Sequence, residues 1–146
     1  MVIEVENSIL LGEVKSVLES GRDARLMTKG RSMNPFIVGG RDSVILRKFP
    51  ESALKRGDVV LAEVKKDFYV LHRILKIDGD AVTLAGDGNI DLFEHCTRAD
   101  IIGTVTRIER SSGRSARPCR AAVWQRLPNR VRWFFLKGFR RLKDIH

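Results

Sequence analysis

Cysteine is scarce in this chain of 146 residues, which contains only Cys96 and Cys119. The two are not in the CxxC spacing that is typical of zinc and redox sites. Neither a disulfide framework nor a metal site is therefore expected, and we expect no cofactor. Low cysteine usage also fits a reducing compartment.

Long hydrophobic runs are absent as well. No stretch of the sequence approaches the roughly 20 apolar residues that a membrane span requires. The first eleven residues carry Glu4 and Glu6 among short apolar runs, which is not the pattern of a signal peptide. We therefore expect a cytoplasmic protein, peripheral at most at the inner face of the membrane.

Acidic residues are almost missing from the C-terminal quarter. Residues 1–109 hold 16 Lys+Arg and 17 Asp+Glu, whereas residues 110–146 hold 11 Lys+Arg and a single acid, Asp144. The formal net charge of +9 thus belongs to the tail. A basic tail suggests an anionic partner, either lipid or nucleic acid, and the alternative is a solvated polar segment.

The remaining sequence has the composition of a protein with a core, since 43% of its residues are apolar. Short apolar runs between Gly, Asp and Asn turn signals predict strands. They cover residues 24–29, 43–47, 59–64, 68–77, 81–85 and 101–110, with an irregular segment at 91–100. The predicted fold class is mainly β (α+β).

Helical spacing of apolar residues is confined to the two ends. Residues 3–20 predict an amphipathic helix that stops at Gly21, and residues 119–127 and 129–143 predict two helices broken at Pro128. We therefore divide the chain into an N-terminal helix (1–24), a β domain (25–110), a linker (111–118) and a basic amphipathic tail (119–146).

One loop carries the strongest chemical signal, from Gly30 to Pro35. Glycine permits unusual dihedrals and close backbone approach, and proline fixes φ, so Ser32 lies on a stiff turn. A nucleophile needs that rigidity, because small misplacements of the attacking atom are costly. The alternative is an ordinary Gly/Pro turn with a surface serine.

Three further segments follow this loop, at residues 55–60, 69–74 and 86–91. In this order and spacing, the four segments resemble the type I signal peptidase family, within the superfamily that includes the LexA-like self-cleaving repressors. The resemblance spans about residues 25 to 109, and its specific parts are the Ser-Met-x-Pro and His-Arg-Ile segments. Typical bacterial members have a lysine base where this chain has His72, which is similar to the archaeal, endoplasmic-reticulum and spore-former branch. Signal peptidases are membrane-anchored, and this chain departs from them in its lack of an apolar span.

The resemblance implies a signal-peptidase/LexA-like β fold and a serine endopeptidase acting on a peptide or protein substrate. Ser32 would attack the carbonyl, and His72, with an ordinary pKa of roughly 6.5, would be the base. A carboxylate that orients the base is expected from Asp87 or Asp91, and the sequence leaves open which one.

Other residues complete the predicted site. Backbone N–H groups near Ser32 would form an oxyanion hole, with Gly30 leaving room for the carbonyl, and Met33 and Pro35 are assigned to the same oxyanion and substrate-binding region. His95, beside Cys96, and the terminal His146 are interpreted as structural or solvated.

Alternative functions of other classes remain. One alternative is a non-catalytic peptide-binding module that retains the fold. Another is a regulator that cleaves itself, as LexA-like repressors do, but residues 1–24 are too short for a DNA-binding domain. For residues 119–146, contact with an anionic membrane or docking on the chain's own domain is favoured over nucleic acid, for which no binding motif is recognised. Substrate sequence and oligomeric state are not readable from the residues.

Overall fold

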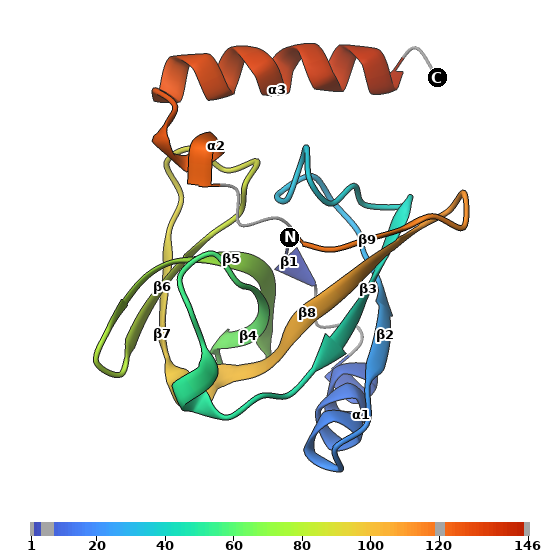
Figure 1. Ribbon diagram of the computed structural model, residues 1–146, viewed down its shortest axis with the longest axis vertical. Coiled ribbons are helices and arrows are strands. Elements are labelled where there is room, and N and C mark those ends of the chain that lie inside the picture. Colours follow the sequence, from blue (N-terminus) through green and yellow to red (C-terminus); the bar gives the residue numbers. More distant parts are fainter. Residues whose placement is uncertain (1, 4–7, 119–121, 145–146) are drawn as a thin grey trace.

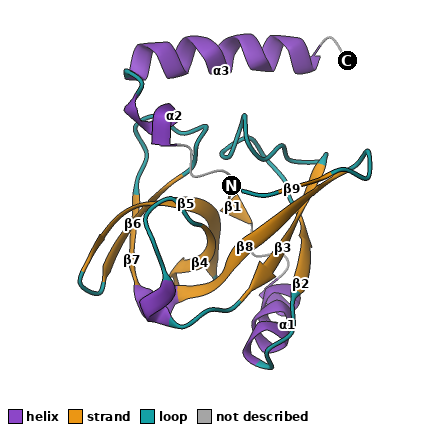
Figure 2. Ribbon diagram, in the orientation of Figure 1, coloured by secondary structure: helices purple, strands orange, loops and turns teal. Residues whose placement is uncertain are grey.

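The protein is mainly β, as predicted. A computed structural model describes residues 2–3, 8–118 and 122–144, whose nine strands form one antiparallel sheet accompanied by three α-helices (Figures 1 and 2). The strands are β1 (Val2–Ile3), β2 (Ala24–Met27), β3 (Asp42–Arg47), β4 (Val59–Lys65), β5 (Phe68–Asp78), β6 (Ala81–Ala85), β7 (Glu94–Thr97), β8 (Ile101–Arg110) and β9 (Ser115–Ala116). The helices are α1 (Ser8–Glu19), α2 (Ala122–Arg126) and α3 (Asn129–Asp144), with short 3₁₀ turns at Glu51–Ala53 and Arg98–Asp100.

The sheet runs in the order β2-β3-β8-β4-β5-β6-β7, and β1 and β9 pair with β5 and β8 outside this path. The six long predicted strands are all present, because each combines an apolar pattern with a clear turn signal. The β4–β5 and β5–β6 connections are tight hairpins, and Asp67 adopts a left-handed φ of 59° at the first of them.

Three elements differ from the sequence expectation. Residues 94–97, expected to be irregular, form β7 on the edge of the sheet beside β6; Glu-His-Cys-Thr has too few apolar residues to signal a strand. Within the expected linker, β9 folds back on β8. The first helix begins at Ser8, not Ile3, since β1 pairs with β5. The start of the next predicted helix, residues 119–121, lies outside the described residues.

Two apolar clusters stabilise the sheet. In one of them α1 buries Leu11, Val14 and Leu18 against β2, β3 and β8. A Cβ at Gly103 of β8 would lie 2.8 Å from Leu18 Cδ1, so the glycine allows this close helix–strand contact. The other cluster, which includes Val60, Val70, Ile74, Val82 and Leu84, joins β4, β5 and β6.

The two C-terminal helices lie at the opposite end of the molecule from α1 (Figure 1). Trp124 of α2 is buried edge-on between Phe36 and Phe135, with ring centroids 5.8 and 5.4 Å away. Its indole Nε1 donates a hydrogen bond to the carbonyl of Asp87 at 2.9 Å. The tail is thus attached to the loops that follow β2 and β6. None of the described helices has the length and apolar character to cross a membrane.

Candidate active site

Ser32 lies in the loop that joins β2 to β3. Gly30 introduces this loop with a φ of 82°, a left-handed conformation that favours glycine. Two successive turns follow, in which Asn34 N–H donates to Arg31 O at 3.1 Å and Ile37 N–H donates to Met33 O at 3.0 Å. The peptide bond before Pro35 is cis. The half-buried serine therefore sits on a backbone that is hydrogen-bonded on both sides.

The loop after β6 packs directly on the serine loop. Gly88 N–H donates to Ser32 O at 2.7 Å. A Cβ at Gly86 would lie 2.2 Å from Ser32 O, and one at Gly88 would lie 2.4 Å from Arg31 O, so only glycine fits at either position. Two of the four segments singled out in the sequence therefore meet at Ser32.

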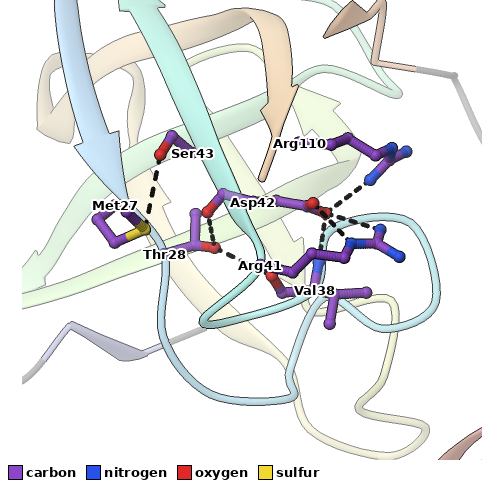
Figure 3. Close-up of polar contacts among 7 residues, drawn as sticks. All are labelled: Met27, Thr28, Val38, Arg41, Asp42, Ser43 and Arg110. Atoms are coloured by element: carbon purple, nitrogen blue, oxygen red, sulfur yellow. Dashed lines mark hydrogen bonds and ion pairs between the residues drawn. The ribbon is translucent and has the colours of Figure 1, made fainter. Parts of the chain in front are cut away.

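Asp42 links the two ends of the serine loop, and its side chain is fully buried (Figure 3). Thr28 Oγ1 donates to Asp42 O at 2.5 Å, while the carboxylate accepts hydrogen bonds from Val38 N–H at 2.8 Å, from Arg41 and from Arg110 (Figure 3). Burial by itself would raise the pKa of Asp42, but these hydrogen bonds hold that pKa below its ordinary value. The sequence alone does not reveal these ion pairs, because Asp42 is part of the Gly39-Gly40-Arg41-Asp42 turn signal and resembles an ordinary turn residue.

His72 of β5 meets the serine. Its Nε2 lies 3.2 Å from Ser32 Oγ, and its Nδ1 is hydrogen-bonded to a carboxylate oxygen of Glu94. The imidazole is almost completely buried, at 1% exposure. Burial lowers the pKa of His72 and outweighs the opposite effect of Glu94. A neutral ring that donates from Nδ1 to the carboxylate presents a free electron pair at Nε2, toward the hydroxyl.

The carboxylate that orients His72 is Glu94, which corrects the expectation of Asp87 or Asp91. Asp87 is buried and forms two hydrogen bonds with Arg73, at 2.8 and 2.7 Å. Asp91 accepts from Asn129 Nδ2 at 3.0 Å. Successive residues of a strand point to opposite faces, so Arg73 and His72 lie on opposite sides of β5. Asp87, which is bound to Arg73, therefore lies on the side away from His72.

Glu94 reaches His72 through strand register. Glu94 pairs with Leu84 across β7 and β6, and Leu84 pairs with Ile74 across β6 and β5. His72 lies two residues from Ile74 and on the same face of β5. The sequence signal for this contact is an acidic residue on β7, the second strand away from β5 in the sheet, and it can be used only once residues 94–97 are recognised as a strand.

The predicted substrate-binding residues have different surroundings. Met33 has 0% exposure and accepts the Asp87 N–H at its sulfur at 3.4 Å, so it supports the loop from within the core and cannot contact a substrate. This corrects its assignment. Gly30 is exposed, while Pro35 is half-buried and lines a cavity with Phe36 and Arg73.

His95 and Cys96 do not form a second site. His95 Nδ1 lies 3.4 Å from Thr83 Oγ1 on the solvent side of β7. Burial raises the pKa of the Cys96 thiol to about 11, which leaves it a poor nucleophile. In the part of the chain that the structure describes, no group of three His, Cys, Asp or Glu residues could hold a metal ion.

Comparison of the chain with models of protein families, with curated proteins and with solved structures finds no match. The architecture that the structure shows is a mainly β antiparallel sheet, and one such fold hosts many functions. The fold alone therefore does not define the function, which depends on the residues around Ser32.

The Arg73–Asp87 pair gives a stability prediction. Asp87→Asn should lower the free energy of unfolding by about 3–5 kcal/mol, because it leaves a buried guanidinium without its carboxylate. Asp91→Asn, at an exposed position, should change that free energy by less than about 0.5 kcal/mol. Urea denaturation of both variants measures the difference, and equal stabilities would show that the buried pair contributes little.

Proposed function

We propose that this protein is a serine endopeptidase of the signal-peptidase-like type. The observation that carries the proposal is the chain of contacts from Ser32 Oγ to His72 Nε2, 3.2 Å apart, and from His72 Nδ1 to Glu94. It supplies a nucleophile, a base and a group that orients the base, which is the arrangement that serine catalysis needs. The resemblance of the four segments to signal peptidases supports the same reaction class.

In the proposed mechanism, His72 Nε2 removes the hydroxyl proton as Ser32 Oγ attacks the peptide carbonyl. Glu94 stabilises the resulting imidazolium, which then donates its proton to the leaving amine. The acyl-enzyme ester is hydrolysed by a water that the neutral imidazole deprotonates. Within the described residues Ser32 N–H donates no hydrogen bond, so we assign it to the oxyanion.

Covalent labelling tests the proposal. A fluorophosphonate probe should modify the full-length protein once, at Ser32, and mass spectrometry of the digest would locate the adduct. His72→Ala should slow the labelling strongly because the hydroxyl loses its base. Ser112→Ala, which changes an exposed serine outside the site, should label like the wild type.

The rival function is a peptide-binding module without catalysis. It predicts no adduct at Ser32 and no cleavage across a broad peptide library, although peptides would still bind. A library digest followed by mass spectrometry, together with a binding assay on the same peptides, separates the two functions.

A further inference from the structure

Helix α3 carries an apolar stripe that is largely exposed. Val131, Phe134 and Phe135 are 42%, 75% and 53% exposed, whereas Leu136, on the other side of the helix, is 5% exposed. Together with Gly138 the three exposed residues follow the i, i+3, i+4, i+7 spacing of a single helix face. An amphipathic helix of a globular protein normally turns this face to the core, whereas here most of the stripe is exposed.

The position of the helix leaves this stripe accessible. Figure 1 shows α3 along the edge of the molecule, with the sheet on only one side of it. Trp124 of α2 and Leu136 of α3 are the buried side chains of the two C-terminal helices, so Val131 and Phe134 are not needed to keep α3 attached. Phe135 also touches the Trp124 ring at its edge. Contiguous exposed apolar surface of this kind marks a protein or membrane interaction site.

Charge decides which partner fits. Arg130 and Lys137 flank the stripe on one side, both exposed, and Lys137 Nζ lies 4.9 Å from the centroid of the Trp133 ring. Residues 110–146 contain 11 basic residues and one acid. A second copy of the chain would bring these like charges together, and nucleic acid would leave the apolar stripe uncovered. An anionic lipid surface pairs with the basic flank and takes up the aromatic side chains as well.

We propose that α3 docks the protein on anionic lipid bilayers, with Val131, Phe134 and the exposed part of Phe135 at the boundary between headgroups and acyl chains. The helix would lie in the plane of the interface, as amphipathic helices with a basic polar face do. Docking depends only on α3 and not on the chemistry at Ser32.

Docking would also bring the candidate active site to the membrane. A cavity separates α3 from residues 88–92, and Gly88 in turn contacts the Ser32 carbonyl. The loops after β2 and β6 lie at the same end of the molecule as α3 (Figure 1). If the proposed function holds, on which this step alone rests, the substrates are polypeptide segments close to an anionic membrane surface.

Vesicle sedimentation of the full-length protein tests the docking. The protein should sediment with vesicles of phosphatidylglycerol and phosphatidylcholine, and less so as salt is raised, but weakly with phosphatidylcholine alone. Phe134→Ser should weaken binding by about tenfold or more, because a large apolar side chain is no longer buried in lipid. Phe49→Ser, which changes an exposed phenylalanine remote from α3, is the matched control and should bind like the wild type.

Other variants make the result decisive. Circular dichroism should show Phe134→Ser to be folded, and Ser32→Ala should sediment like the wild type, which separates docking from catalysis. Absence of sedimentation with anionic vesicles at low salt would overturn the proposal, as would equal binding of Phe134→Ser and wild type. Dimers or oligonucleotide complexes that are lost in Phe134→Ser, without vesicle binding, would assign the stripe to a second copy or to nucleic acid instead.

Discussion

Ser32→Ala is expected to lower the turnover of a peptide substrate by a factor on the order of 10⁴ or more, since it removes the attacking atom. The fold should be unaffected. The half-buried hydroxyl makes one side-chain hydrogen bond among the described residues, to His72, and such a bond stabilises a protein by about 1 kcal/mol. Turnover of a peptide identified in the library digest, together with urea denaturation, measures both quantities.

His72→Ala should reduce turnover to a similar extent, because a serine hydroxyl without its base is a weak nucleophile. The double variant should be no slower than either single one, since residues that act as a unit are strongly non-additive. His95→Ala, which removes a histidine of β7 outside the site, is the control and should retain activity. Cleavage that persists undiminished in Ser32→Ala would exclude the mechanism.

Much of the fold follows from local signals. β8 was predicted with the same bounds as observed because Ile, Val and Thr recur through residues 101–110, and Gly21 ends α1 as predicted, with a φ of 86°. The association of Ser32 with His72 could be predicted as well, from two short motifs in one order. A serine in a loop between glycine and proline can be recognised from local composition alone, regardless of where in the chain its histidine partner lies.

The remaining features of the site depend on how the strands pair and how the loops pack, which local composition does not reveal. Glu94 meets His72 only after β5, β6 and β7 have paired, and β7 is a polar edge strand with hardly any apolar alternation. Asp87 lies in the motif that suggests a catalytic role, yet it forms an ion pair with Arg73, the residue after His72. Met33 belongs to the most specific motif and is nevertheless buried, because it supports the loop from below. A motif therefore locates a site more reliably than it assigns a role to each of its members.

Glu94→Gln is expected to lower turnover by a factor on the order of 10²–10⁴, because the amide keeps the shape of the side chain but loses the charge that stabilises the imidazolium. The substrate KM should change much less, since Glu94 lies behind the base and away from the hydroxyl. Steady-state kinetics separates the two parameters. Asp91→Asn, which changes a carboxylate that contacts Asn129 instead, is the matched control and should leave both parameters unchanged.

The pH profile distinguishes this role from a purely structural one. The proposed mechanism requires the neutral imidazole, and burial lowers the pKa of His72, so wild-type activity should rise with pH through a midpoint below about 6.5 and be level at neutral pH. The Glu94 carboxylate opposes that effect, because it favours the protonated ring. In Glu94→Gln the midpoint should therefore move to still lower pH while the plateau falls. A midpoint that stays in place or moves upward would show that Glu94 is not the charge that His72 senses, and that the carboxylate serves only to hold β7 against β5.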